Sequence, residues 1–96
     1  MTYLSIIIPA HNEEKRLPET LRAIDVFVNA QPYVVEVLVV DNGSVDETAQ
    51  IVRAYMDEHK HVRLLQEPSR GKGLAVRRGM LSARGEFRFM CDADLS

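Results

Sequence analysis

Cysteine is almost absent from this sequence, which has Cys91 as its only thiol among 96 residues. A lone cysteine excludes an intrachain disulfide and is typical of proteins from a reducing compartment. Long apolar runs are also missing, and no stretch approaches the ~20 residues that a membrane-spanning helix needs. The apolar stretch that begins at Tyr3 has no basic residue before it, which argues against a signal peptide. The chain as given therefore predicts a cytoplasmic protein.

Charge of one sign is not in strong excess either. The 12 Lys and Arg residues and 14 Asp and Glu residues give a net charge of −2, so no basic field favours nucleic acid as a partner. Proline and glycine are few, with 4 and 5 residues, and no repeat or low-complexity tract interrupts the chain. A sequence of this length and composition predicts one globular domain, residues 1–96.

Apolar segments rich in Val and Ile alternate with segments of helical spacing. The apolar runs are nearly continuous, as in strands that are covered on both faces. Between them, stripes such as Leu17, Leu21 and Ile24 repeat with the period of a helix. This alternation predicts an α/β fold, a Rossmann-like parallel sheet with helices on both faces. The predicted strands are Tyr3–Ile8, Tyr33–Val40, Val62–Gln66 and Glu86–Cys91.

Capping residues predict where the helices begin and end. Pro18 suits the first turn of a helix, where its missing N–H costs nothing. Ser44 and Glu47 have the spacing of a capping box, which would open a second helix whose apolar stripe begins at Val45. Gly85 stands where a left-handed residue would end a third helix.

Polar residues gather just after each predicted strand. The segments are PAHNEE, DNGSVDET, EPSRGKG and DADLS. In a parallel sheet, ligands bind beyond the carboxyl ends of the strands, at the point where the strand order reverses. We therefore expect these segments to converge on one binding site.

Asp92 and Asp94 follow the last apolar run directly. Two carboxylates at this spacing can face the same small volume, which is unfavourable unless a cation or a proton lies between them. Mg²⁺ or Mn²⁺ suits such oxygen ligands and often shares them with substrate phosphates. A turn or a helix N-cap past the strand would explain the same two residues without a metal.

Two other acidic positions follow strands. Asp41 ends the second predicted strand, where it could accept hydrogen bonds from a ligand or from local backbone N–H groups in a turn; its local sequence favours the turn. Glu13 and Glu14 follow the first strand. Either could meet a ribose, or both could lie near the positive end of the next helix.

Positive charge is concentrated in Arg70, Lys72, Arg77 and Arg78, within one loop and the start of a helix. Glycines at 71 and 73 let backbone N–H groups approach an anion, and a helix N-terminus favours it. The segment predicts a diphosphate neighbourhood, although a solvated helix face accounts for at least one of Arg77 and Arg78. Neither the G-x-x-x-x-G-K-[ST] loop nor the G-x-G-x-x-G dinucleotide pattern is present.

The histidines and the cysteine predict no chemistry of their own. His11, His59 and His61 are not spaced as a metal-ligand set, and the last two are predicted in a polar surface loop. Cys91 lies within a predicted buried strand, where a cysteine is typically a small core residue and not a nucleophile.

Together the segments resemble the family 2 glycosyltransferases of the GT-A fold, through SIIIPAHNEEKRLPETL, VVDNGSVDET, RGKGLAVRRGM and MCDADLS, in this order. The likeness spans nearly the whole chain. It is strongest to the polyprenyl-phosphate sugar transferases, in particular dolichyl-phosphate β-glucosyltransferase-like enzymes. The resemblance implies that residues 1–96 are the nucleotide-sugar-binding part of such a domain, truncated after the D-x-D motif. The general base and most of the acceptor site would then lie beyond this chain.

The resemblance also implies a role for each matching residue. Asp92 and Asp94 would be the D-x-D motif, which binds a divalent metal, Mg²⁺ or Mn²⁺, and the ribose and diphosphate of the donor. Asn42 and His11 depart from the family, where a second Asp and a Tyr are common. The other implied contacts are Pro9, Ala10 and Glu13 around the nucleoside, Asp41 at the base, and Lys72 and Arg77 near the diphosphate.

The implied activity is a metal-dependent, inverting transfer of a sugar from UDP-glucose or, next, GDP-mannose to a polyprenyl or dolichyl phosphate. This would place the full-length protein at the cytosolic membrane face, and the chain alone would be inactive. One alternative is a nucleotide-binding fragment without catalysis. Another is a haloacid dehalogenase-like phosphotransferase with Asp92 as nucleophile, which is disfavoured because that family carries D-x-D after its first strand. An unfinished sheet would expose the fourth strand as an edge, so the isolated chain is expected to form a homo-oligomer.

Overall fold

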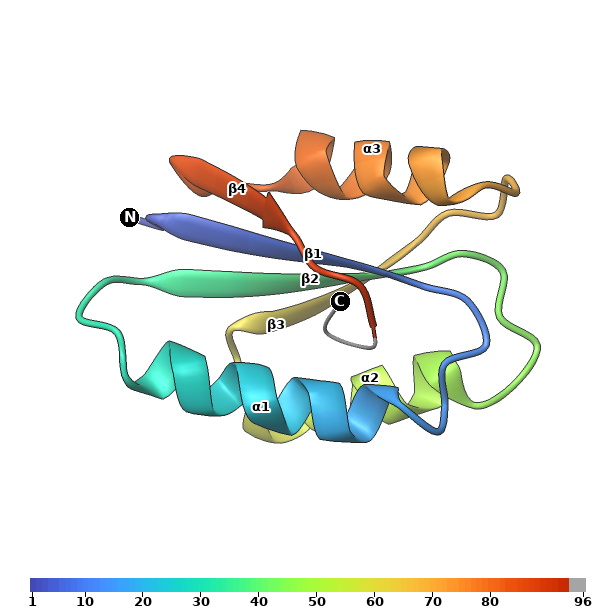
Figure 1. Ribbon diagram of the computed structural model, residues 1–96, viewed down its shortest axis with the longest axis horizontal. Helices are drawn as coiled ribbons and strands as arrows, with labels where there is room; N and C mark the ends of the chain where they lie inside the picture. Colours follow the sequence, from blue (N-terminus) through green and yellow to red (C-terminus); the bar gives the residue numbers. More distant parts are fainter. Residues whose placement is uncertain (94–96) are drawn as a thin grey trace.

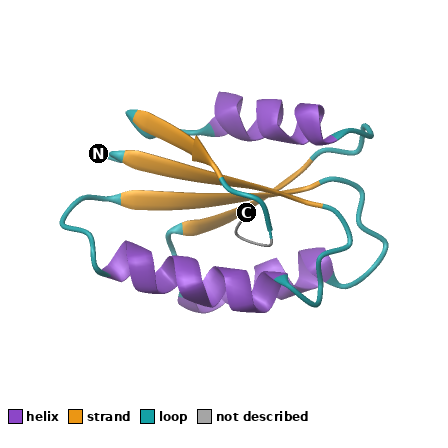
Figure 2. Ribbon diagram, in the orientation of Figure 1, coloured by secondary structure: helices purple, strands orange, loops and turns teal. Residues whose placement is uncertain are grey.

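A computed structural model describes residues 1–93 as a four-stranded sheet with helices on both faces (Figure 1). All strand pairs are parallel, and the strand order is β3-β2-β1-β4. The predicted α/β fold and its alternation of strands and helices are confirmed (Figure 2). Along the chain the elements are β1 Leu4–Ala10, α1 Leu17–Asn29, β2 Val35–Asp41, α2 Thr48–Glu58, β3 Val62–Gln66, α3 Lys72–Ser82 and β4 Phe87–Met90.

The helices divide the sheet into two apolar layers, because successive side chains of a strand point to opposite faces. Ile6 and Ile8 of β1 pack in the cluster that includes the buried side of α1 and α2. Ile7, between them, packs in a second cluster with Ala75 of α3. Among the helices of residues 1–93, α3 lies on one face of the sheet, whereas α1 and α2 lie together on the other (Figure 1). Within residues 1–93, none of the helices has the length and apolar character needed to cross a membrane.

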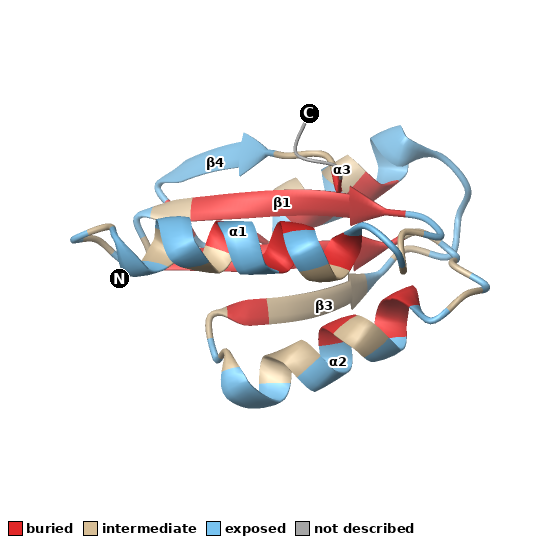
Figure 3. Cartoon of the chain, turned by 60° about the horizontal axis from the view of Figure 1, so that its bottom comes forward, coloured by how far each residue is buried: buried red, intermediate tan, exposed pale blue. Residues whose placement is uncertain are grey.

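Burial differs sharply between the central strands and β4. Strand β2 is buried along its whole length. The four residues of β4 are all exposed (Figure 3). The prediction of a buried fourth strand is therefore wrong, and Cys91 lies half-buried just after the strand. The strand lies at one edge of the sheet, where it pairs with β1 on one side and with no other strand of residues 1–93. The expectation of an exposed edge is confirmed.

The ends of α1 and α2 test the capping predictions. Pro18 lies in the first turn of α1, as predicted. The capping box is not formed, because α2 begins at Thr48 and Glu47, which precedes it, makes no capping bond through its side chain. The Ser44 hydroxyl instead accepts a hydrogen bond from the backbone N–H of Asn12, 2.9 Å away. Val45 precedes the helix and is exposed, so its predicted place on the apolar stripe of α2 is also wrong.

Gly85 is needed for close packing and not for a left-handed turn. Helix α3 ends at Ser82, and only Gly43 and Gly71 among the glycines of residues 1–93 have positive φ. A Cβ atom at Gly85 would lie 2.5 Å from the hydroxyl oxygen of Ser5 and 2.6 Å from its backbone nitrogen. The glycine therefore allows the segment between α3 and β4 to lie directly on β1.

Candidate functional site

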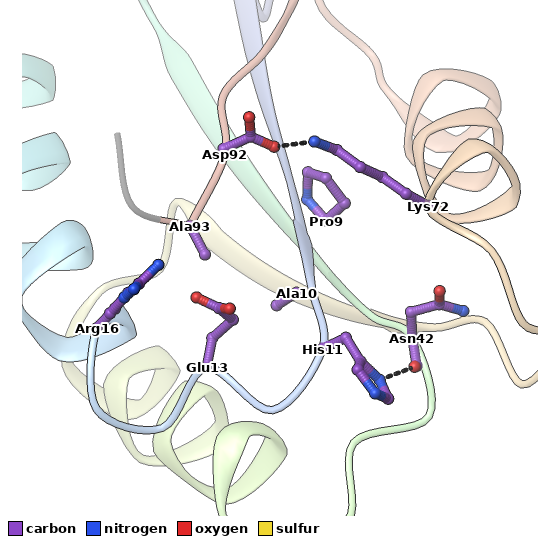
Figure 4. A pocket seen from close by; sticks show the side chains of 9 residues that line it. All are labelled: Pro9, Ala10, His11, Glu13, Arg16, Asn42, Lys72, Asp92 and Ala93. Atoms are coloured by element: carbon purple, nitrogen blue, oxygen red, sulfur yellow. Dashed lines mark hydrogen bonds and ion pairs between the residues drawn. The ribbon is translucent and has the colours of Figure 1, made fainter. Parts of the chain in front are cut away.

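The strand order reverses beside β1, where the chain passes from β1 to β2 on one side and returns through α3 to β4 on the other. Loops leaving the carboxyl ends of β1 and β4 separate at such a point and leave a crevice. A cavity of about 310 Å³ lies here. Figure 4 shows the residues that line it, which are Pro9, Ala10, His11, Glu13, Arg16, Asn42, Lys72, Asp92 and Ala93.

Proline at the end of β1 helps to open this cavity. The carbonyl of Ile7 accepts a hydrogen bond of 2.9 Å from the N–H of Cys91, just beyond β4. Alternate residues of a strand face the same neighbour, so Pro9 also faces the β4 side. Because Pro9 has no N–H to donate, the pairing between the two strands cannot continue there. Pro9 and Ala10 were predicted in a loop, but they are the last residues of β1 and are buried.

Lys72 and Asp92 form an ion pair across the mouth of the cavity (Figure 4). Lys72 is the first residue of α3, and Gly71 before it has φ of 126°, a value that side chains rarely permit. Asp92 follows the end of β4. Their side chains are 56% and 29% exposed, so the pair stays accessible to a ligand and its own contribution to stability is small.

The segment after β4 is also held from the other face of the sheet. The hydroxyl of Thr20, a buried residue of α1, donates a hydrogen bond to the carbonyl oxygen of Ala93. Ala93 is itself buried in the cluster formed with α1 and α2. Asp92 is thus fixed between this contact and the bond from Cys91 to β1.

Two loops are joined beside the cavity, and this contact places Glu13. Asn12 has φ of 53°, and its side-chain oxygen accepts a hydrogen bond of 2.9 Å from the N–H of Val45. The N–H of Glu13 donates to the hydroxyl of Thr48 at 2.9 Å. The loop after β1 therefore follows the path of the loop after β2, which brings Glu13 to the cavity wall.

Asp46 is the acceptor at the centre of this loop contact. Its carboxylate accepts hydrogen bonds from the N–H of Glu14 at 3.2 Å and from both the N–H and the hydroxyl of Thr48. Desolvation opposes ionisation and raises the pKa of Asp46, but the bonds from Thr48 and Glu14 outweigh it and bring the pKa below its ordinary value. The ionised carboxylate is thereby the form that holds the two loops together.

Asp41 and Arg77 do not line the cavity. Asp41 is buried, and its Oδ1 atom accepts a hydrogen bond of 3.1 Å from the N–H of Ser44, as expected of a residue in a local turn. Arg77 is exposed on α3 and contributes to a separate groove with Leu74. It lies five residues beyond Lys72, which corresponds to roughly 7.5 Å along a helix axis.

Other residues of the cavity had no predicted role. His11, Arg16, Asn42 and Ala93 line it beside the predicted residues. Asn42 and Ala93 directly follow Asp41 and Asp92 in the sequence, so their position after a strand was the available signal. Arg16 lies just before α1, and no local pattern marks it.

A divalent cation would find one predicted ligand within the described chain. Asp92 presents a partly exposed carboxylate at the cavity, and Asp94, the second predicted ligand, lies outside the described residues. Residues 1–93 contain no group of three or more His, Cys, Asp and Glu side chains arranged to hold a metal. Mg²⁺ and Mn²⁺ often take only one or two protein carboxylates and complete their shell with phosphate and water. The single carboxylate of Asp92 is therefore compatible only with a metal that takes most of its ligands from phosphate and water.

Comparisons with known sequences find that this chain is similar to sugar-transferring enzymes. The sequence model described as "Glycosyl transferase family 2" matches residues 5–96. A dolichyl-phosphate beta-glucosyltransferase from Dictyostelium discoideum is 41% identical over 100 residues, covering 96% of this chain and 31% of that protein. This chain thus spans less than a third of the length of that relative.

Solved structures share the same arrangement of strands and helices. Mannosyltransferase PcManGT from Pyrobaculum calidifontis, in complex with GDP-Man and Mn²⁺, aligns with a TM-score of 0.81 and 33% identity, covering 95% of this chain and 27% of that one. TarS 1–349 from S. aureus, in complex with UDP, aligns with a TM-score of 0.83 and 31% identity, covering 97% of this chain and 28% of that one.

Proposed function

This chain belongs to glycosyl transferase family 2, and on that premise we propose that it is the donor-binding part of a metal-dependent, inverting glycosyltransferase. The donor is a nucleoside diphosphate sugar, and the acceptor is a polyprenyl or dolichyl phosphate. The observation that carries the proposal is the pairing of Lys72 with Asp92 in a cavity at the carboxyl ends of β1 and β4. A cation and a carboxylate side by side suit a ligand that combines a diphosphate with a divalent metal.

The lining of the cavity suggests which residues would contact each part of the donor. Pro9, Ala10 and Glu13 line it from the β1 side and would contact the nucleoside. Asp41 would meet the base through acceptor capacity of its carboxylate that the bond from Ser44 to Oδ1 leaves unused. Lys72 would hold the diphosphate.

Arg77 would approach the diphosphate only if its long side chain turned towards the start of α3. The exposed position of Arg77 leaves its side chain room for that movement. We therefore expect Arg77 to contribute less than Lys72 to binding of the diphosphate.

Charge development explains why a lysine is useful here. In the transfer, the bond between the anomeric carbon and the diphosphate oxygen breaks while an acceptor oxygen bonds to that carbon. The leaving diphosphate gains negative charge, which the ammonium group of Lys72 would stabilise at short range. None of the described residues is assigned as the general base that such a transfer requires.

Asp92 and Asp94 would hold Mg²⁺ or Mn²⁺ against the diphosphate. A bound metal would neutralise the developing charge on the leaving group. A solved relative of similar fold contains Mn²⁺ together with GDP-Man, which supports a divalent metal here. Before the donor binds, Lys72 supplies the counter-charge for Asp92.

UDP-glucose is the favoured donor because the curated relative is a dolichyl-phosphate beta-glucosyltransferase. GDP-mannose is the next candidate, since a structural relative binds GDP-Man. The proposed acceptor, a dolichyl or polyprenyl phosphate, is taken from the name of the same relative. A lipid phosphate acceptor would bring the full-length protein to the cytosolic membrane face. With less than a third of the relative's length, this chain is expected to bind the donor without transferring its sugar.

Calorimetric titration of the chain with UDP-glucose and with GDP-mannose tests the proposal, each with and without Mn²⁺. We expect metal-dependent binding of one donor, and loss of that binding in the Asp94→Ala variant. Binding of equal strength with and without Mn²⁺ would contradict the metal-dependent mechanism. If neither donor binds, a longer chain that includes the remainder of the transferase domain decides whether the proposal fails.

A further inference from the structure

The segment between β3 and α3 carries Lys72 to the cavity and has no regular structure of its own. One side chain from another loop holds it. The Nδ2 atom of Asn42 donates hydrogen bonds to the carbonyl oxygens of Glu67 at 2.9 Å and Ser69 at 2.7 Å. The Oδ1 atom of Asn42 accepts a hydrogen bond of 3.2 Å from the N–H of Gly71.

Asn42 is itself fixed at the ends of β1 and β2. Its backbone N–H donates to the carbonyl of Ala10 at 2.8 Å. Its carbonyl oxygen accepts a hydrogen bond of 2.7 Å from the Nδ1 atom of His11. Because Asn42 is anchored to the ends of the central strands, its side chain fixes the position of the segment that ends at Gly71.

These contacts require an amide. A carboxamide presents two donor hydrogens and an acceptor at one tip, whereas an ionised carboxylate can only accept. An aspartate at position 42 could still accept from Gly71, but it would face the carbonyl oxygens of Glu67 and Ser69 without a hydrogen to share. The negative charge of the aspartate would then repel these carbonyl oxygens, and the segment would move away from residue 42.

We propose that Asn42 is a positioning residue, whose amide holds the β3–α3 segment so that Lys72 stands beside Asp92 and can receive a diphosphate. The proposal rests on the proposed function, because the diphosphate is the ligand that Lys72 serves. Gly71 connects the two parts directly, because its N–H donates a hydrogen bond to Oδ1 of Asn42 and the next residue is Lys72. The asparagine that departs from the family pattern thus has a structural use in this chain.

The first experiment compares Asn42→Asp with the wild-type chain by NMR. We expect the backbone amide signals of residues 69–72 to shift in the variant, because the segment leaves its place. Gln50→Glu is the matched control, since Gln50 is exposed on α2 and the same amide-to-carboxylate change there should leave these signals in place. If Asn42→Asp does not fold, Asn42→Ala removes the same donors without adding a charge. Unshifted signals in the folded variant would overturn the proposal.

The second experiment measures UDP affinity in the presence of Mn²⁺. Asn42→Asp should weaken binding about tenfold, and the same substitution should have little further effect in the Lys72→Ala background, since Asn42 acts through Lys72. A shifted segment with unchanged UDP affinity would overturn the positioning role, as would an equal loss in the Lys72→Ala background. If the wild-type chain does not bind UDP, the affinity test moves to the longer chain, and failure of that chain to bind would overturn the proposed function. The NMR signals still decide whether Asn42 holds the segment.

Discussion

Lys72 and Asp92 belong to different elements, the start of α3 and the segment after β4, and their side chains form an ion pair at the reversal of the strand order. Neither residue is close to the other along the chain. The contact depends on the crossover through α3, on the pairing of β4 with β1, and on the two loops that hold the surrounding backbone. The charge pattern of the candidate site is therefore a product of the sheet topology.

Replacing Lys72 with Met should weaken UDP binding about tenfold, because the diphosphate would lose its cationic partner. The free energy of unfolding should change by less than about 1 kcal/mol, since the ion pair is partly exposed. Calorimetric titration and urea denaturation measure the two quantities. Lys60→Met is the control, because Lys60 is exposed and lies between α2 and β3. Equal UDP affinity in the two variants would contradict the role of Lys72.

Gly79→Ala should destabilise the fold by about 1–3 kcal/mol. The new Cβ would lie 2.4 Å from the Cγ2 atom of Ile7, and Ile7 is completely buried and has no room to move. Gly73→Ala in the same helix meets nothing within 4 Å and should stabilise α3 by up to about 1 kcal/mol. Urea denaturation of both variants gives the comparison, and destabilisation by Gly73→Ala equal to that by Gly79→Ala would show that packing on β1 is not the cause.

Acid should destabilise the protein through Glu36. This buried carboxylate accepts hydrogen bonds from the Ser5 hydroxyl and the Arg84 N–H, both at 2.6 Å, and pairs with Arg63 at 3.1 Å. Desolvation raises the pKa of Glu36, but these hydrogen bonds and the charge of Arg63 together bring the pKa below the ordinary value of 4.5. The stabilisation is thus fully present above pH 4.5 and is lost as the pH falls through the lower, folded pKa.

Glu36→Gln isolates this effect. At neutral pH the variant should be less stable by about 1–3 kcal/mol, because hydrogen bonds to a charged acceptor are lost. The difference from the wild type should shrink as the pH is lowered below 4.5. Urea denaturation across a pH series measures it, with Glu58→Gln at the exposed end of α2 as control. A difference that stays constant over the whole range would count against the charged state of Glu36.

The isolated chain should self-associate through β4. Phe87 and Phe89 are 55% and 58% exposed on an edge strand, and an unpaired edge with apolar side chains favours pairing with a second copy. Phe89 also lines an apolar hollow of about 440 Å³ beside α1. We expect Phe89→Lys to lower the mean mass measured by light scattering, while Val26→Lys on the exposed side of α1 leaves it unchanged. A wild-type chain that stays monomeric throughout a concentration series would contradict this prediction.

The sequence determined the kind of fold and the places where chemistry could occur. Continuous apolar runs and helical stripes are local patterns, and they predicted the strands, the helices and the α/β class of the fold. The resemblance of the loop motifs to family 2 glycosyltransferases implied the GT-A fold, to which the similar solved structures belong. Parallel strands put all their carboxyl ends on one edge, so the polar segments after β1, β2, β3 and β4 could be predicted to converge. Glu13, Lys72 and Asp92 were found in this way, whereas Pro9 was implied by the family resemblance.

Only the tertiary structure decided the partners of these residues. Ser44 and Glu47 fit a capping box locally, but the hydroxyl of Ser44 is taken by Asn12 from another loop. Gly85 fits a helix end locally, but its lack of a side chain serves the approach to Ser5. These contacts join residues that are distant in the chain, so the local sequence carries no signal for them. The exposure of β4 has the same origin, because an apolar run does not say which strand will lie at the edge of the sheet.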